Sequence, residues 1–416
     1  MKKSNFIISI ALLMFMFVAC CKKADTTYNP VTSGEIRIGV LLSLTGGGYS
    51  TGQSSQVSLE LARQDITAYL EALNLDREVT LEVLDTKTDT AEALKQLKVL
   101  YDKGIRVVIG PYSSAEVAAV KPFADSRGIL IISPSSVAVS LAIPDDNIFR
   151  FVSSDVIQGR AMTQMLVEDH IKTIVPLVRD DLWGRDLLAS TKADFISAGG
   201  SVHAPVMYPP QTSSFLAFLN KLDSNVAEEI LSHDPREVAV YMLTLSEGGG
   251  FLHEASNLVN LNNVSWYGSS AFAQNASLLS DSIAGRFAFD HGLPCPIFGL
   301  DDAAQEKWQP LSKRIQAQTG HLADAYAFTA YDALWVSVLS LLKTGISPEI
   351  SFLKSVFMLE SANFFGVSGS TTLDVNGDRA IGNYDFWAVK RAANGYIWKR
   401  VAKYNSVTGQ LTRVVE

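Results

Sequence analysis

The sequence predicts an α/β protein built on mostly parallel sheets covered by helices on both faces. Short apolar runs rich in β-branched residues alternate with longer helical stretches along most of the chain. This alternation is typical of β-α-β units, which form parallel sheets. The runs are apolar on both faces, as expected for strands buried between two helical layers. This alternation of strands and helices is interrupted once, at residues 147–155, and then resumes, which suggests two similar lobes.

The first half supplies four strands and three helices. A strand at residues 36–44 runs into a glycine-rich loop, which leads to a long helix over residues 53–73. The remaining elements alternate in the same way, with strands at residues 79–86, 105–110 and 129–133 and helices at residues 91–104 and 115–128.

The second half repeats the alternation of helices and strands, which then gives way to helical stretches and a final β-region. Its predicted helices are residues 158–170, 184–200, 215–223 and 251–260, and its predicted strands are residues 173–178, 203–208, 238–245 and 264–268. Three more helical stretches follow residues 285–290, and the one at 323–342 is apolar nearly all round, which predicts a buried helix. Residues 371–404 predict β-structure with turns at Asn376-Gly377 and Asn394-Gly395.

Composition and motifs exclude several classes of function. The 416 residues carry a net charge of −8, and no basic face indicates a nucleic-acid partner. The sequence contains no phosphate-binding loop with its lysine, no dinucleotide fingerprint and no nucleophile elbow, and its six histidines lack metal-ligand spacing. We therefore predict no catalytic residue, no cofactor and no metal.

The N-terminus predicts export. Two lysines precede an apolar run at residues 6–18, which is too short to span a bilayer as a helix. A small residue before Cys20 resembles the bacterial lipoprotein box, so residues 1–19 are expected to be a signal peptide and Cys20 the lipidated residue. Cys21 is a competing site, and an uncleaved anchor or plain secretion is the alternative. Residues 20–34 would then tether the protein to a membrane, facing the periplasm or the cell exterior. Cys295 is predicted to be a partly buried free thiol.

Two neighbouring strands are each followed by serines. Ser113 and Glu116 have the spacing of a helix capping box, which leaves Ser114 without that role. The next strand leads to a second predicted helix start at Ser135, Ser136 and Val137. Ligands of open α/β sheets bind at the carboxyl ends of strands, where helix N-termini offer N–H groups and partial positive charge. These residues are therefore expected to face one small anion, such as a carboxylate.

An aspartate-rich stretch near the C-terminus partly matches the pattern of a calcium-binding loop. Asp374, Asn376, Asp378 and Asp385 occupy the first, third, fifth and twelfth positions of the pattern. The sixth position, however, is Arg379 instead of glycine, and the twelfth is not glutamate. A β-turn within a hairpin is the favoured interpretation.

Seven stretches occur in the order found in one protein family: "IRIGVLLSLTG", "GIRVVIGPYSS", "GILIISPSS", "FRFVSSD", "LWGRDL", "YAFTAYDAL" and "LDVNGDRAIGNYDFW". From Ile36 to Trp398 the chain resembles the leucine/isoleucine/valine-binding branch of the type I periplasmic binding proteins, which are substrate-binding proteins of ABC transporters. The resemblance implies a monomer that does no chemistry, binds a small molecule and has a membrane permease as its partner. A ligand-sensing regulatory module on the same fold is the alternative.

The resemblance also implies two Rossmann-like lobes joined by three hinge crossovers, which close on a ligand between them. The crossovers would fall near residues 152–155, residues 288–290 and Trp387. The N-terminal lobe would then comprise residues 35–153 plus 289–386, and the C-terminal lobe residues 154–288 plus 387–416.

The family's ligand site can be carried over to this chain residue by residue. The serine that binds the ligand carboxylate corresponds to Ser114, with Tyr112 and Ser113 beside it. The backbone carbonyl that takes the ligand ammonium corresponds to Ser135. Val137 stands where the family has a threonine, so a hydroxyl is lost while the N–H remains.

The other side of that site matches less well. The resemblance places aromatic residues against the ligand at Trp183 and Tyr326. Ser270, however, stands where the family has the carboxylate for the ammonium, and Thr244 where it has a tyrosine. Glu247 is a candidate substitute for the missing carboxylate. We therefore expect a small amino-acid-like or carboxylate-bearing organic ligand and favour one that is not a standard branched-chain amino acid.

Overall fold

The computed structural model describes residues 33–345 and 348–414. The predicted signal peptide and the lipidation sites Cys20 and Cys21 lie outside the described residues. The predicted division of the chain into two lobes remains a prediction, and the sheets below are described as they pair.

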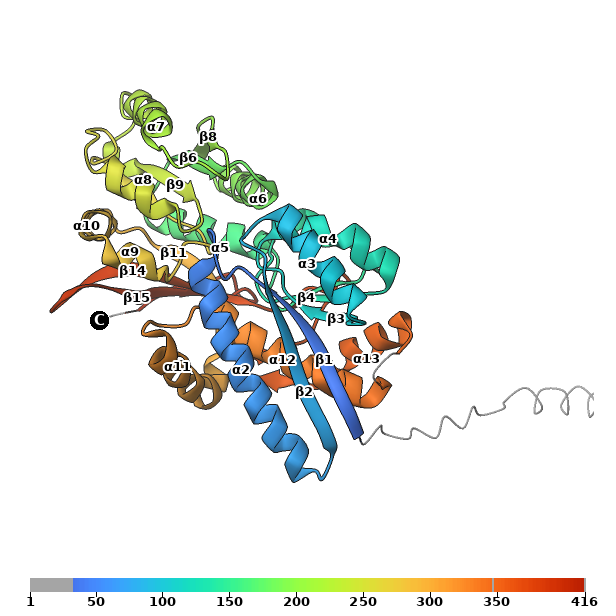
Figure 1. Ribbon diagram of the computed structural model, residues 1–416. Coiled ribbons are helices and arrows are strands. Elements are labelled where there is room, and N and C mark those ends of the chain that lie inside the picture. Colours follow the sequence, from blue (N-terminus) through green and yellow to red (C-terminus); the bar gives the residue numbers. More distant parts are fainter. Residues whose placement is uncertain (1–32, 346–347, 415–416) are drawn as a thin grey trace, which may run out of the picture. The chain divides into compact units, whose positions relative to one another are not determined.

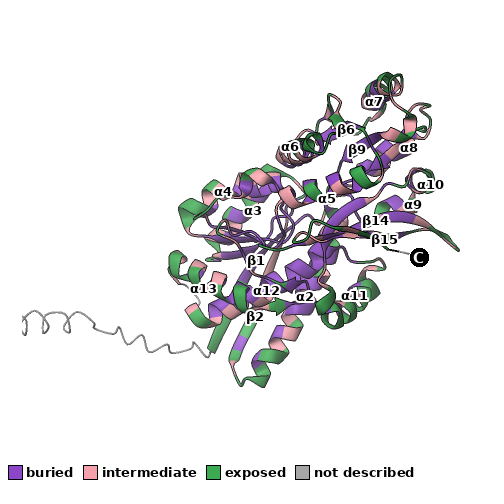
Figure 2. Cartoon of the chain, turned by 180° about the vertical axis from the view of Figure 1, so that it is seen from behind, coloured by how far each residue is buried: buried purple, intermediate pink, exposed green. Residues whose placement is uncertain are grey.

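The first sheet is parallel and has five strands in the order β2-β1-β3-β4-β5. The strands are β1 (Ser33–Leu42), β2 (Asp76–Asp85), β3 (Val107–Ile109), β4 (Leu130–Ser133) and β5 (Ile148–Arg150). The helices that follow the first three strands are α2 (Tyr49–Ala72), α3 (Thr90–Asp102) and α4 (Ser114–Arg127) (Figure 1). Alternate side chains of β1 enter different cores, since Ile38 and Val40 lie in one and Leu41 in the other. Strands β3, β4, β5 and most of β1 are buried as predicted, whereas the edge strand β2 is mostly half-buried (Figure 2).

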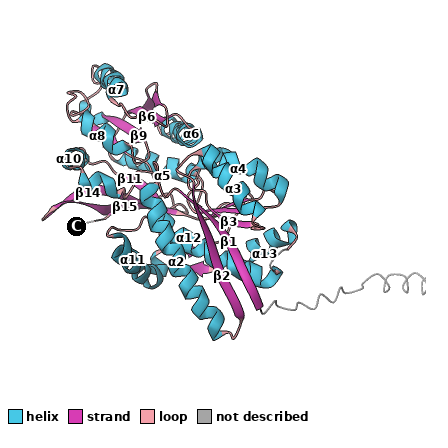
Figure 3. Cartoon of the chain, viewed as in Figure 1, coloured by secondary structure: helices cyan, strands magenta, loops and turns pink. Residues whose placement is uncertain are grey.

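The second sheet is also parallel, with β10-β9-β6-β7 in order and β8 paired to β6. Its strands are β6 (Thr173–Arg179), β7 (Ser201–Val202), β8 (Val206–Tyr208), β9 (Val238–Leu243) and β10 (Ser265–Tyr267). Its helices are α5 (Asp155–Glu168), α6 (Leu182–Ser197), α7 (Leu216–Glu229), α8 (Gly248–Ala255), α9 (Ala276–Ser280) and α10 (Ser282–Asp290) (Figure 3). Two parallel sheets with helical connections confirm the predicted fold class.

The last part of the chain forms a third, antiparallel sheet in the order β11-β14-β15-β16. The strands are β11 (Cys295–Gly299), β14 (Asn383–Ala392), β15 (Gly395–Tyr404) and β16 (Leu411–Arg413), and a separate pair is β12 (Phe365–Gly366) with β13 (Gly369–Ser370). The hairpin between β14 and β15 confirms the turn predicted at Asn394-Gly395. The pairing of β11 with β14 was not predicted.

Three helices lie between these strands: α11 (Gln305–Thr319), α12 (Ala325–Thr344) and α13 (Ile350–Asn363). Among the described residues, α12 is the one helix long and apolar enough to cross a membrane by composition, but most of it is buried within the folded chain. Its side chains pack with those of β1 and α2 in one core. The predicted burial of this helix is confirmed.

Two predictions of local structure are wrong. Helix α2 begins at Tyr49 instead of residue 53, because Gly52 lets the first turn lie against the segment just after β1. A Cβ atom at Gly52 would be 2.0 Å from the Ser43 carbonyl oxygen. The second serine cluster starts no α-helix; a loop leads to the short 3₁₀ helix η1 (Val139–Leu141). Residues 288–290 form the end of α10, and the crossover predicted near them remains a prediction.

The aspartate-rich stretch forms the turn that the sequence favoured. The Asp374 Oδ1 atom accepts hydrogen bonds from the backbone N–H groups of Asn376 (2.8 Å) and Asp378 (3.1 Å). The Asp378 side chain pairs with Arg150 at the end of β5, and both are nearly fully buried. The turn therefore anchors a late segment of the chain to the edge of the first sheet.

Candidate ligand-binding site

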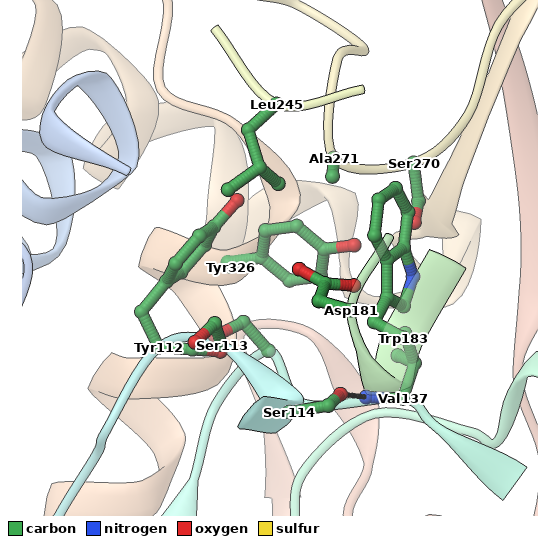
Figure 4. Close-up of a pocket in the computed structure, with 11 residues that line it drawn as sticks. Tyr112, Ser113, Ser114, Val137, Asp181, Trp183, Leu245, Ser270, Ala271 and Tyr326 are labelled. Carbon is green, nitrogen blue, oxygen red and sulfur yellow. Dashed lines mark hydrogen bonds between the residues drawn. The ribbon is translucent and has the colours of Figure 1, made fainter. Parts of the chain in front are cut away.

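One pocket lies where the carboxyl ends of strands from both parallel sheets converge, as expected for open α/β sheets (Figure 4). The loops after β3 and β4 contribute Tyr112, Ser113, Ser114, Ser135 and Val137. The loops after β6, β9 and β10 contribute Asp181, Trp183, Leu245, Ser270 and Ala271, and the first turn of α12 contributes Tyr326. The space open to the centres of water molecules is about 20 Å³, enough for roughly one water molecule.

The N-terminus of α4 forms one wall of the pocket. The Ser113 Oγ atom accepts a hydrogen bond from the Glu116 N–H (3.2 Å), and the Glu116 carboxylate accepts one from the Ser113 N–H (2.9 Å). This capping box confirms the predicted role of Ser113. Burial raises the pKa of Glu116 and so disfavours a negative charge there. The N–H groups at the start of the helix have no partner within the helix itself, so they are suited to an anion in the pocket.

Ser114 has structural partners that the sequence did not reveal. Its Oγ atom accepts hydrogen bonds from the backbone N–H groups of Val137 (3.2 Å) and Ala138 (3.2 Å), and it lies 3.0 Å from the Ser136 Oγ atom. The Ser135 hydroxyl donates to the Tyr112 carbonyl oxygen (2.8 Å). The loops after β3 and β4 are therefore bonded to each other. These bonds hold Val137 and Ala138 away from the helical conformation predicted for the second loop.

Aromatic side chains provide most of the apolar wall. The rings of Tyr112 and Tyr326 meet edge to face with their centres 6.4 Å apart. Burial raises the pKa of both hydroxyl groups, which keeps them protonated and able to donate hydrogen bonds. Trp183 lies across the pocket from Tyr112 (Figure 4). These rings suit an apolar or aromatic ligand body.

Asp181 is an acidic residue of the pocket that sequence reasoning missed. It precedes α6, where its Oδ1 atom accepts a hydrogen bond from the Gly184 N–H (2.9 Å). Its Oδ2 atom accepts one from the Arg179 Nε atom (2.8 Å). Its position two residues before Trp183, an aromatic residue already assigned to the site, is the signal that would have identified it.

Glu247, the candidate substitute for the missing carboxylate, does not line the pocket. Its Oε1 atom accepts hydrogen bonds from the Arg179 Nη1 atom (2.6 Å), the Tyr208 hydroxyl (2.8 Å) and the Leu245 N–H (3.2 Å). Glu247 thus fixes the loop that carries Leu245 and shares Arg179 with Asp181.

The structure brings together the other residues that the sequence singled out, with two exceptions. Ser270 lines the pocket, and its buried hydroxyl lies beside that of Tyr326. Ser136 lies behind Ser114 and is not part of the lining. Thr244 is buried under α8, where a Cβ atom on Gly248 would lie 2.3 Å from its Oγ1 atom. The role of these residues in binding remains a prediction.

Comparisons with known proteins identify the family. The family model described as "Periplasmic binding protein" matches residues 35–390. An uncharacterized protein of Methanocaldococcus jannaschii is 27% identical over 417 residues, which cover 95% of this chain and 96% of that protein. The leucine binding protein of Thermotoga maritima has a similar fold, with a TM-score of 0.74 and 21% identity over 89% of this chain and 99% of that one. A solute binding protein of an ABC transporter from R. palustris, in complex with benzoate, has a TM-score of 0.71 and 18% identity over 88% of this chain and 96% of that one. The chain therefore belongs to the type I periplasmic binding proteins, a family of extracytoplasmic solute-binding proteins.

Proposed function

We propose that the protein is the solute-binding component of an ABC transporter and that its pocket binds a small amino-acid-like or carboxylate-bearing organic molecule. The observation that carries this proposal is that one pocket takes its walls from the strand ends of two different parallel sheets. The structural relatives support the ligand class, since one is a leucine binding protein and another holds benzoate. Both of those ligands carry a carboxylate on an apolar body.

The carboxylate of the ligand would bind at the N-terminus of α4. Ser113 caps this helix at the pocket wall, where backbone N–H groups and the helix dipole favour negative charge. The apolar body would lie among Tyr112, Trp183 and Tyr326. This arrangement requires no residue that performs chemistry on the ligand.

Asp181 is the residue that would bind an ammonium group, if the ligand carries one. Its carboxylate accepts one hydrogen bond at each oxygen, and each oxygen has a further lone pair for a ligand donor. The positive charge of Arg179 offsets part of its attraction for an ammonium. An amino acid would thus use Asp181, whereas a simple carboxylic acid would lie beside it without that bond.

Entry of such a ligand requires the pocket walls to move apart, because the present space holds about one water molecule. Hinge motion between packed units is a common way for a protein to close around a ligand. We propose that the ligand-bound closed form is the one presented to a membrane permease. The lipid anchor at Cys20 would keep the protein close to that permease.

A calorimetric titration tests the ligand class. The soluble form beginning at Lys22 would be titrated with leucine, with 4-methylpentanoate, which lacks only the amino group, and with benzoate. At least one of these carboxylates should bind, and Trp183→Ala should weaken that binding. If none binds, or if isobutanol and toluene bind as tightly as the acids, the proposed ligand class is wrong.

The variant Asp181→Asn then separates the two kinds of ligand. Asparagine keeps the cap of α6 but removes the charge. Affinity for leucine should fall about ten- to hundredfold if Asp181 binds an ammonium, while affinity for 4-methylpentanoate should not fall. Asp180→Asn is the matched control, because Asp180 pairs with Arg185 and does not line the pocket. Equal losses for both ligands would contradict the assigned role of Asp181.

A further inference from the structure

A second cavity lies between the antiparallel sheet and the helices α11 and α12. Its volume is about 260 Å³, and it shares no lining residue with the first pocket. Most of its wall is apolar and includes the rings of Phe298, Trp308, Phe328 and Trp387. A cavity with aromatic walls and few polar groups has the features of a small-molecule site, although its volume is slightly below the usual range.

The polar part of this cavity is an ion pair between a buried carboxylate and a partly exposed arginine, with one unused acceptor. Asp385 is 5% exposed, and its Oδ2 atom accepts a hydrogen bond from the Arg400 Nη1 atom (3.2 Å). Its Oδ1 atom has no hydrogen-bond partner among the described residues. A buried carboxylate oxygen without a donor is costly, and native structures satisfy such groups with a protein group, water or a ligand. The Oδ1 atom itself has almost no accessible surface, so a ligand donor reaches it only after a small rotation of the Asp385 side chain toward the cavity that this residue lines.

The charges around the cavity favour a neutral ligand. Asp385 and Arg400 both line it and offset each other's charge. At its edge Asp302 pairs with Lys403 (2.5 Å) and lies 3.8 Å from Arg400, so these four groups are balanced. A charged ligand would add an uncompensated charge to an apolar cavity. A neutral N–H or O–H donor would satisfy Asp385 without this cost.

We propose that this cavity is a second binding site, for a neutral single-ring or indole-sized aromatic molecule with one N–H or O–H donor. The ring packs among Trp308, Trp387 and Phe328, and the donor bonds to the Asp385 Oδ1 atom. Ala325 and Phe328 line this cavity, while Tyr326 of the same helical turn lines the first pocket. The two sites thus lie on different sides of the start of α12.

The test compares p-cresol with 4-methylanisole, in which the donor hydrogen is replaced by a methyl group. The indole N–H resonances of the ¹⁵N-labelled soluble protein, assigned by single Trp→Phe variants, report each tryptophan separately. We expect p-cresol to shift the signals of Trp308 and Trp387 saturably, with a dissociation constant of about 0.1–1 mM for a ligand of this size. Affinity for 4-methylanisole should be at least about tenfold weaker, because it cannot donate to Asp385.

Two variants locate the site within the cavity. In Asp385→Asn the amide oxygen still accepts the hydrogen bond from Arg400, so the amide NH₂ group stands where Oδ1 was. This group cannot accept a hydrogen bond from the p-cresol hydroxyl, so affinity for p-cresol should fall about tenfold or more. Ser312→Phe, on the part of α11 that lines the cavity, should block binding by filling the space, whereas Ser312→Ala should not. Trp183→Ala should leave p-cresol binding at this site unchanged.

Three results would overturn the proposal. The first is that p-cresol shifts only the Trp183 signal, or none at all. The second is equal affinity for p-cresol and 4-methylanisole. The third is unchanged binding in both Asp385→Asn and Ser312→Phe, each shown by its melting curve to be folded. The test does not depend on the first pocket, so the proposed function can fail without affecting it.

Discussion

The substitution Ser114→Ala distinguishes two roles for the residue at the centre of the candidate site. The resemblance to the family assigns Ser114 to the ligand carboxylate. In the structure its hydroxyl oxygen instead accepts hydrogen bonds from the backbone N–H groups of Val137 and Ala138. Both of these residues are buried, so water cannot replace the lost acceptor without a change in the loop.

The expected loss of stability follows from those two donors. Leaving a buried N–H group without a partner costs about 1–3 kcal/mol, so two of them suggest a loss of about 2–6 kcal/mol. At about 2.1 cal/mol/K per residue, some 380 folded residues have an unfolding entropy of about 0.8 kcal/mol/K. The melting temperature should therefore fall by about 3–8 °C.

Calorimetric melting without ligand, followed by a binding titration, provides the assay. Ser136→Ala is the matched control, because it removes a neighbouring hydroxyl but leaves both N–H groups bonded to Ser114. It should cost at most about 1.5 kcal/mol, or roughly 2 °C. An unchanged melting temperature in Ser114→Ala together with a large loss of affinity would refute the structural role and support direct contact with the ligand.

Three further predictions concern stability, pH and thiol reactivity. Asp378→Asn leaves the buried charge of Arg150 without a negative partner, so the free energy of unfolding by denaturant should fall by about 3–5 kcal/mol. Asp234→Asn, in an exposed ion pair, should lower it by less than about 1 kcal/mol. Similar losses in the two variants would contradict the importance of burial. Burial raises the pKa of Asp155, so the folded state binds this proton more tightly than the unfolded state does. The free energy of unfolding therefore falls as the pH rises above about 4, where the unfolded state loses the proton. Asp155→Asn should therefore raise the melting temperature at pH 7–8, with a gain that shrinks towards pH 4, and a gain independent of pH would contradict this. Cys295 is fully buried and its pKa is raised, so a thiol reagent should modify it only after denaturant is added, and rapid labelling of the native protein would be the contrary result.

The order of strands and helices could be predicted because each element has a local signature. Apolar β-branched runs and amphipathic stretches alternate through the first 270 residues or so, and this pattern fixes the two parallel sheets. The antiparallel sheet was only half predicted. The hairpin of β14 and β15 has a recognisable turn, whereas the partner of Cys295–Gly299 lies more than eighty residues later along the chain, and nothing local specifies that pairing.

The start of α2 was misplaced for a similar reason. Three glycines in a row and a nearby Gly52 read as a loop, since glycine weakens helices. In the folded chain Gly52 has a packing role, because the helix approaches the Ser43 carbonyl too closely for any side chain. Tertiary contact here outweighs local propensity.

The sequence predicted most of the residues that line the candidate site, but not the hydrogen-bond partners of their hydroxyl groups. Hydroxyl side chains at the carboxyl end of a strand predict a place for polar contacts, and the structure does bring Ser113, Ser114 and Ser135 to one pocket. The sequence cannot choose their partners, because a ligand oxygen and a neighbouring loop make the same chemical demand on a hydroxyl. The distances from Ser114 to the N–H groups of Val137 and Ala138 favour the neighbouring loop. If that role is correct, the anion preference of the pocket belongs to the backbone of α4 and to Ser113, and the Ser114 hydroxyl acts by holding the two loops in the geometry that the ligand requires.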